Sequence, residues 1–565
     1  RHATMSVMAE DVQLTKAQKV FTMLGALLGL LLAALDQTIV STAGPKIQKD
    51  LQIEAGLYVW ITTAYLVAST VLVPIYGKLS DLYGRRKIRL IAVIIFLSGS
   101  FLCGVSQSST QLIAARAVQG IGSAGLFTSA FAVVADLFPP AERGKWQGMF
   151  GAAFGVSSVI GPLMGGFITD NFGWHWAFFI NLPLGLIAIA FIVIYMPPLR
   201  PADGSRKKLD IAGAVALALA VLPLLFGLSL GHSATREAAG WPWLSWQIVT
   251  LFGISLVGTV AFVWVERRAE SPILDLGLFK IKTFAIGALA AFVVGGAFLG
   301  AIVYLPLFMV NVVGLSSTSS GLTTVPLTFG IVAANITSGQ LVSRLGSYKG
   351  LLVGSLVILV CAFILLATTL TPDATQLGVS AKMVLLGIGL GPSIPLFTLA
   401  IQTSVQPSQI GVATAAATFF RQLGFTIGIA IAGTTFAGAF ASTLQSGIPE
   451  ATADVPAAMR DQLQPQRSDD DDPLVAFDPA KVMEQADRKI DASPMPADLK
   501  PLAKQRAHAT IERVARVFKV AYTNGLVSVF WILLLVAILA LAITTVLPQL
   551  PLRTGPPGAR PPIAD

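Results

Sequence analysis

The chain has 565 residues, of which 54% are hydrophobic and only 12% are charged, and its mean hydropathy is +0.73. These values exclude an ordinary soluble globular protein. The net charge of +9 alone would also fit a nucleic-acid-binding protein, but in a membrane protein Lys and Arg follow the topology, so their distribution decides between the two classes.

The apolar residues gather in runs long enough to cross a hydrocarbon core of about 30 Å as helices. The chain is therefore predicted to be an all-α polytopic membrane protein with 14 transmembrane helices. They are expected at residues 20–42, 58–77, 88–107, 111–135, 146–168, 176–196, 210–231, 246–265, 283–310, 318–342, 349–370, 377–402, 411–438 and 523–547. Residues 1–19 lack the apolar core of a signal peptide, so we expect the first run to be retained as a span.

The basic residues predict the orientation. With residues 1–19 inside, the short inner loops and ends hold about 22 Lys and Arg, among them Arg206–Lys208, whereas the short outer loops hold about four. This asymmetry predicts a multi-pass protein of the bacterial cytoplasmic (inner) membrane, with the N-terminus and the Pro-rich tail 548–565 in the cytoplasm. It also explains the positive charge without nucleic acid.

Residues 441–522 form a long polar segment that the span count places in the periplasm. Its first part is Pro-rich and predicts a loop, while 479–491 and 499–520 have the composition of surface helices. The run Asp469–Asp472 lacks the Gly turn and terminal Glu of a calcium loop and is expected to be a solvated patch. The segment is a candidate contact for a periplasmic partner.

An internal repeat divides the chain. Four residues of the loop after the second span recur 262 positions later, Gly77, Leu79, Gly84 and Lys87 matching Gly339, Leu341, Gly346 and Lys349. The repeat predicts two six-helix halves, 20–196 and 283–547, with two additional helices, 210–265, inserted between them. Parallel six-helix repeats are one of the known arrangements of secondary transporters.

The loop between spans two and three carries a predicted cytoplasmic gate. Its glycines allow tight turns, Asp81 can lie against a helix N-terminus, and the basic residues can pair with Asp136 at the end of span four. Such a network would latch the two halves together. The predicted gate residues are Gly77, Asp81, Gly84, Arg85, Arg86 and Asp136. A plain inner loop that carries positive charge is the alternative.

This loop resembles the signature of the major facilitator superfamily, and the flanking sequence resembles its fourteen-span drug:proton antiporters (EmrB/QacA type). The matching segments are Leu35–Val40, Arg116–Gly122, Gly161–Gly166, Trp174–Pro183, Tyr304–Phe308 and Arg421–Gly424. The resemblance implies the major facilitator fold, and it implies that Gly161, Pro162, Gly165 and Gly166 form the antiporter motif of span five. Two positions depart from the pattern: Ser157 replaces a glycine, and Ser343 stands where Asp81 stands in the first half, so the second latch should be weaker or absent.

Asp36 is the deep carboxylate of the predicted spans. A charged side chain in the membrane is costly and usually functional, so Asp36 is predicted to carry protons, with a structural hydrogen-bonded aspartate as the alternative. The resemblance assigns Arg116 to the same proton transfer; snorkelling or structural pairing is the alternative for this residue.

Further polar residues of the spans are candidates to line a substrate cavity. They are Gln37, Gln119, Asn181, Tyr304 and Arg421. Arg421 has no obvious acidic partner in the second half, so it either faces an anionic group of the substrate or pairs with backbone carbonyls.

The sequence predicts neither a metal site nor a cofactor. Cys103 and Cys361 both lie in apolar runs, none of the four histidines lies deep in a span, and no phosphate-binding loop is present. The proton gradient is therefore the expected energy source, and no constellation supports an enzyme.

The resulting hypothesis is proton-coupled efflux of drugs or other small amphipathic compounds by alternating access within the lipid bilayer. With one deep carboxylate, the expected substrates are neutral compounds or monovalent cations. An exporter of lipids, lipid conjugates or an endogenous metabolite in the same fold is the alternative. A sensing protein without turnover is disfavoured, because it would not need a titratable Asp36.

Overall fold

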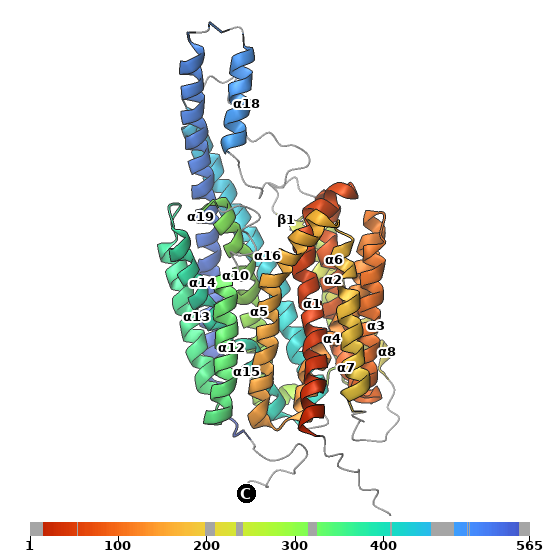
Figure 1. Cartoon of the computed structure of the whole chain (residues 1–565). Helices are drawn as coiled ribbons and strands as arrows, with labels where there is room; N and C mark the ends of the chain where they lie inside the picture. Colours follow the sequence, from red (N-terminus) through yellow and green to blue (C-terminus); the bar gives the residue numbers. More distant parts are fainter. Residues whose placement is uncertain are drawn as a thin grey trace, which may run out of the picture.

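The computed structural model describes residues 15–53, 55–197, 209–232, 241–314, 325–406, 409–453, 479–493, 495–496 and 498–552. Helices dominate this part of the chain (Figure 1), and a two-residue parallel ribbon joins β1 (Gly231–His232) to β2 (Trp241–Pro242). The predictions for Arg206–Lys208, for Asp469–Asp472 and for the outermost parts of both termini lie outside the described residues.

Fourteen described segments are long and apolar enough to cross a membrane, which confirms the predicted number of spans and the all-α class. Span six consists of two consecutive helices, α6 and α7, and span twelve of α14 and α15. The first half contains α1 (Lys16–Asp50), α2 (Ala55–Tyr83), α3 (Arg85–Gly104), α4 (Ser109–Leu137), α5 (Pro140–Asn171), α6 (Trp176–Phe179) and α7 (Asn181–Tyr195). The inserted pair is α8 (Ile211–Leu230) and α9 (Trp246–Glu266), followed by the 3-10 helix η1 (Leu276–Lys280). The second half contains α10 (Lys282–Asn311), α12 (Val325–Leu345), α13 (Lys349–Thr369), α14 (Gln376–Leu390), α15 (Ser393–Ser404), α16 (Ile410–Ala451) and α19 (Lys500–Thr545), with α18 (Pro479–Ala492) outside the bundle.

Short polar side chains define where several helices begin. Thr15 and Gln18 form a capping box at the start of α1, and Ser108 and Ser245 accept a backbone N–H in the first turns of α4 and α9. Each cap satisfies a donor that the helix itself leaves unpaired.

The internal repeat is visible in the backbone. Gly84 and Gly346, the matched glycines of the two loops, have φ angles of 91° and 63°, a region that side chains with a Cβ rarely occupy. The chain turns at each of these glycines to enter the third helix of the corresponding half.

The two halves meet along two helix pairs at the end of the bundle where these loops lie. On one side α2 packs on α16, and a Cβ at Gly77 would overlap Ala415. On the other side α5 packs on α12, side by side in Figure 1, and a Cβ at Gly339 would overlap the carbonyl oxygen of Gly144. The repeated glycines therefore occupy equivalent contacts between the halves.

The inserted helices lie against the junction of the two halves. α8 packs on α2 and α16, and Trp60 of α2 contacts Phe226 of α8 with ring centroids 5.1 Å apart. The hydroxyl of Ser255 in α9 donates to the carbonyl of Ala220 in α8 over 2.6 Å, so the pair forms a tight hairpin.

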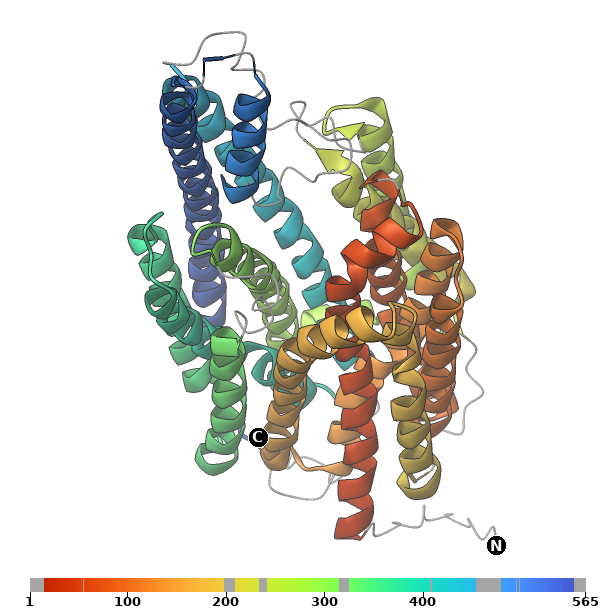
Figure 2. The same ribbon diagram turned by 45° about the horizontal axis from the view of Figure 1, so that its top comes forward.

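The long polar segment contains more continuous helix than expected. α16 continues past the predicted end of its span to Ala451, and α19 begins at Lys500 instead of forming a separate surface helix at 499–520 before the last span. Together with α18 the outer parts of α16 and α19 form a stalk (residues 441–451, 479–492 and 500–522) that rises beyond the bundle in Figures 1 and 2.

Aromatic and ionic contacts hold the stalk together. At its base, the Phe440 ring lies 4.9 Å from Tyr522 and 6.2 Å from Phe518. Further out, His508 of α19 lies 2.9 Å from the Asp487 carboxylate of α18. Hydropathy marks where an apolar run stops, but these helices continue because they have partners outside the membrane.

Candidate functional site

Asp36 and Arg116 form an ion pair inside the first half. The Arg116 guanidinium donates to Asp36 Oδ2 over 2.6 Å, and the side chains are 0% and 1% exposed. Gln119 and Asn181 donate to Asp36 Oδ1 over 2.7 and 3.1 Å. α1, α4 and α7 thus bring together four residues singled out in the sequence, with Asp36 accepting hydrogen bonds from the other three.

Backbone and aromatic groups hold Arg116 from the other side. Its Nε donates to the Ile61 carbonyl over 3.0 Å, and its guanidinium lies 4.4 Å from the centroid of the Tyr65 ring. The Tyr65 hydroxyl is 2.6 Å from Ser123 Oγ, and the half-buried Gln37 interacts with the same hydroxyl. Arg116 is therefore paired inside the half instead of snorkelling to the surface.

Ser100 of α3 completes this network. Asn181 Nδ2 donates to Ser100 Oγ over 3.0 Å, and the Ser100 hydroxyl donates to the Phe178 carbonyl over 2.9 Å. Sequence reasoning missed Ser100 and Tyr65, because a serine or tyrosine in an apolar run is too common to be a signal by itself.

The predicted gate residues lie at the end of α2 and the start of α3, with Asp136 at the end of α4. Arg85 Nε donates to Asp136 Oδ2 over 2.9 Å, and Arg85 also contacts Asp81 and Ser80. Arg86 instead donates to the Val193 carbonyl of α7. The gate cluster thus joins α2, α3 and α4 of the first half.

The second half contacts the predicted gate residues through the N-terminus of α16. A Cβ at Gly411, in the first turn of α16, would overlap both the Asp81 carboxylate and the Arg85 guanidinium. A carboxylate at this position lies at the positive end of the helix dipole. At the repeated position, the Ser343 hydroxyl donates to Gly339 of its own helix over 3.1 Å. Of the two repeated loops, the first carries an aspartate at this position, Asp81, and the second carries Ser343.

The segment predicted to be the antiporter motif, Gly161–Gly166, packs α5 on α1. A Cβ at Gly161 would overlap Thr38, and Gly165 lies against Ile39. The Thr38 hydroxyl donates to the Ser157 carbonyl over 3.1 Å, so serine at 157 is compatible with the close approach. Pro162 lies within α5, and Gly166 faces Thr42 at ordinary contact distance.

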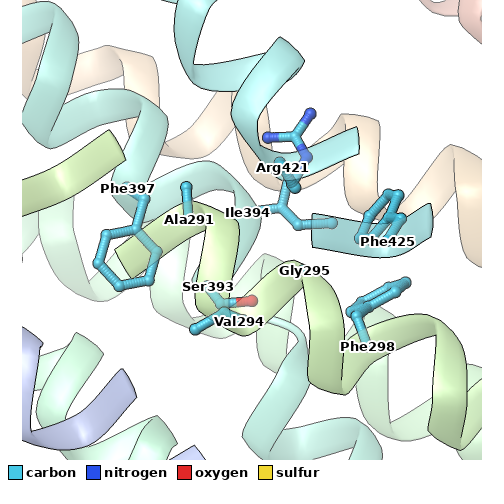
Figure 3. A pocket seen from close by; sticks show the side chains of 9 residues that line it. All are labelled: Ala291, Val294, Gly295, Phe298, Ser393, Ile394, Phe397, Arg421 and Phe425. Carbon is cyan, nitrogen blue, oxygen red and sulfur yellow. The ribbon is translucent and has the colours of Figure 1, made fainter. Parts of the chain in front are cut away.

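Arg421 lies in a small pocket of the second half, next to the first half. Figure 3 shows its guanidinium together with Ile394 and Phe425, and the Phe298 and Phe425 rings stack at 5.5 Å. Arg421 is 8% exposed and lies 5.9 Å from the Phe131 ring of α4. Within the described part of the chain no carboxylate pairs with it. The pocket has about 10 Å³ of space for a water molecule, room for about one.

Tyr304 does not lie with these residues. Its ring contacts Phe436 of α16 at 5.3 Å, within the apolar core of the second half. A glutamine pair that the sequence did not suggest bridges the halves instead. Gln147 of α5 donates to Gln402 of α15 over 2.9 Å, and Gln402 donates to the Phe131 carbonyl over 3.2 Å and to Thr414 over 3.0 Å.

A family model described as "Major Facilitator Superfamily" matches residues 26–429. "Multidrug resistance protein 3" of Bacillus subtilis (strain 168) is 39% identical over 429 residues, which is 76% of this chain and 82% of that protein. "Multidrug transporter protein MdtP" of the same organism is 40% identical over 422 residues, covering 74% of this chain and 75% of that protein.

Two solved structures share the fold. The human organic anion transporter MFSD10 has a TM-score of 0.55 at 18% identity, over 74% of this chain and 94% of its own. The proton:xylose symporter XylE has a TM-score of 0.53 at 15% identity, over 73% of this chain and 88% of its own. At this identity the likeness concerns the fold alone.

Proposed function

Because this chain belongs to the major facilitator superfamily, and is thus a membrane transporter and not an enzyme, we propose that it exports small amphipathic compounds in exchange for protons. The names of the two Bacillus subtilis relatives, a multidrug resistance protein and a multidrug transporter, support efflux of several compounds. The distribution of Lys and Arg supports an inner-membrane location, with the gate and both termini in the cytoplasm.

The buried pair of Asp36 and Arg116 carries the proposal of proton coupling. Two opposite charges in low-dielectric surroundings depend on one another, and protonation of Asp36 leaves Arg116 without its counter-charge. Because the pair links α1 to α4 and, through Ile61, to α2, its protonation state can change how these helices pack. A proton entering from outside would thus be coupled to reorientation of the first half.

The contacts between the halves support alternating access. Three contacts hold the halves together at the end of the bundle that carries the predicted gate. They are Gly77 against α16, Gly339 against α5, and the hydrogen bond between Gln147 and Gln402. Opening that end requires these contacts to separate while the packing inside each half is kept. This is the rigid-body type of transition found in many transporters.

The pocket at Arg421 supports a different substrate charge from the one expected from sequence. Asp36 is enclosed by its own hydrogen bonds, whereas the charged group of the described pocket lining is the Arg421 cation. Phe298, Phe397 and Phe425 supply apolar contact. Neutral or anionic amphiphiles are therefore favoured over monovalent cations, once the halves separate enough to enlarge the pocket.

The test compares Asp36→Asn with wild type and with Asp50→Asn in reconstituted vesicles. Asp50 is an exposed aspartate at the end of the same helix, so its substitution is the matched control. An imposed pH gradient should drive uphill transport of a fluorescent amphiphile by wild type and Asp50→Asn. Asp36→Asn should retain downhill exchange but lose the pH-driven component, because asparagine cannot exchange a proton.

Uphill transport by Asp36→Asn at the wild-type rate and equal expression would place the proton site elsewhere. Efflux assays with a panel of neutral, anionic and cationic compounds in a pump-deficient host address the substrate class. Lipid extraction from the same host tests the alternative of lipid export.

A further inference from the structure

The inserted helices carry a groove on their outward, membrane-facing surface. It has a volume of about 420 Å³, and its lining is almost entirely apolar. Its walls include the exposed side chains of Leu219 from α8 and of Ile254 and Val257 from α9, and Gly253 leaves open space where a side chain would otherwise fill it. Lining residues include Leu219, Gly253, Ile254, Val257, Gly258 and Ala261. Neither the gate nor the Asp36 network involves these residues.

The groove runs along one face of α9 toward the gate end. Gly253, Val257, Ala261 and Trp264 follow one another at helical spacings of four, four and three residues. The Trp264 side chain is 60% exposed and lies in the last turn of the helix, the level at which tryptophan marks the membrane–water interface. Below it the groove meets the headgroup layer.

Two arginines stand at that end of the groove. The Arg268 guanidinium stacks 4.0 Å from the centroid of the Trp264 ring, and the neighbouring Arg267 is exposed. No carboxylate of the described residues forms an ion pair with either. Glu266 is buried and accepts the backbone N–H groups of Ile273 and Leu274, while Glu270 is exposed nearby. Among the described residues, Arg267 and Arg268 therefore present two cations without an ion-pair partner at this end of the groove, and Glu270 is the exposed carboxylate nearby.

We propose that this groove binds an anionic phospholipid, with one acyl chain along Gly253 to Ala261 and the phosphate on Arg267 and Arg268. The apolar groove, Trp264 and the two arginines succeed one another in the same order as the acyl chain, the interfacial region and the phosphate of a lipid. A second copy of the chain fits less well. In a two-fold symmetric dimer through this face, the arginines of both copies would meet at the same depth and repel.

Native mass spectrometry of the full-length protein tests the proposal, after reconstitution in phosphatidylcholine with phosphatidylglycerol and mild extraction. Wild type should retain phosphatidylglycerol over phosphatidylcholine. Arg267→Gln with Arg268→Gln should weaken retention roughly 25-fold, since each basic residue near an anionic surface contributes about fivefold. Lys280→Gln with Lys282→Gln is the charge control, because both lysines are exposed at the same end of the bundle.

Filling the groove tests the acyl-chain part. Gly253→Leu meets nothing within 4 Å, so it fills the groove without strain and should abolish selective retention. Gly354→Leu, an exposed glycine of α13 that also has open space, is the matched control, and Val257→Phe replaces the first variant if that one misfolds.

Unchanged retention in the groove variants would overturn the proposal and leave surface charge alone as the cause. Loss of a dimer peak in Gly253→Leu, with no lipid bound to wild type, would overturn it in favour of a second copy. Equal retention of both lipids by wild type would also overturn it. None of these outcomes depends on transport, so they are independent of the proposed efflux.

Discussion

At the residue scale, the fully buried Arg116 depends on a single carboxylate. Its other neighbours are the Ile61 carbonyl, the Tyr65 ring and the Gln119 amide oxygen, none of which carries a charge. Buried pairs of this kind contribute little net stability, but the loss of one partner leaves an uncompensated charge. The structure thus predicts a strong thermodynamic coupling between Asp36 and Arg116.

A double-mutant cycle measures that coupling. Asp36→Asn should lower the free energy of unfolding by about 3 kcal/mol, because Arg116 remains buried and charged. Asp36→Asn combined with Arg116→Gln should recover much of the loss, since the neutral amides can hydrogen-bond to each other. Denaturant or thermal unfolding in detergent gives the values. If the double variant is no more stable than Asp36→Asn, the two residues are not coupled in this way.

Arg421 leads to a prediction about substrate charge. Arg421→Gln should weaken transport of anionic amphiphiles about tenfold, the typical scale of a charge-assisted hydrogen bond, while neutral compounds of similar size change little. Concentration dependence of efflux in vesicles measures the effect. Arg344→Gln removes an exposed arginine outside the pocket and serves as the control. Equal losses for neutral and anionic compounds would mean that Arg421 supports the fold and does not recognise charge.

How far the sequence predicted the site depends on the kind of residue. Asp36 and Arg116 stand out because charges in apolar runs are rare, and the motifs that contain Gln119 and Asn181 pointed to the same region. Arg421 was found, but its position against Phe131 was not, because that contact depends on how two halves pack across a long sequence separation. Gln147 and Gln402 had no signal, since glutamine in a span is uncharged and forms no motif here.

At the element scale, Gly77 and Gly339 allow the two halves to approach closely at the end of the bundle that carries the predicted gate. Gly339→Val has to displace the backbone of Gly144, so it should favour the conformation in which α5 and α12 separate. Spin labels at Tyr83→Cys and Leu345→Cys, both exposed on opposite halves, report the change in a Cys361→Ser background. The distance between them should increase on the order of 5 Å or more.

Gly354→Val is the control for this measurement, because a side chain there has open space. The same distance distribution in Gly339→Val and Gly354→Val would show that the contact at Gly339 does not stabilise the closed gate.

The stalk is predicted to depend on its base more than on its tip. Phe518→Ala removes a buried ring from the contact with Phe440 and should cost about 3 kcal/mol of stability. Replacing residues 452–499 with a short Gly-Ser linker leaves that contact in place and should preserve folding. Thermal unfolding and size-exclusion chromatography compare the two proteins. Equal destabilisation by both changes would contradict the distinction.

Sequence patterns predicted the helices well where the membrane defines them. All fourteen spans were anticipated, because a hydrocarbon core demands an apolar run of fixed length. The ends of α16 and α19 were not, since outside the membrane a helix continues as long as its own side chains find partners. A hydropathy pattern does not indicate which partners a helix has outside the membrane.

At the scale of the whole molecule, the repeat gives the protein two similar contacts between its halves with different chemistry. Both pairs of helices, α2 with α16 and α5 with α12, approach through glycine, but only the first carries an aspartate at the helix N-terminus. The inserted hairpin lies on the first pair alone. The two contacts between the halves therefore differ in charge and in the helices packed against them, although the fold repeats.

The part of α19 that belongs to the stalk is continuous with the last span of the second half. Because α19 is a single helix of 46 residues, its outer end is expected to move together with the second half. The outer part, residues 500 to 522, is about 33 Å long. A rotation of that half by about 15° would sweep the tip through roughly 9 Å. Rotation of the second half during transport would thus move the outer end of α19 further than the helices of the bundle, at a place where a neighbouring molecule could contact it.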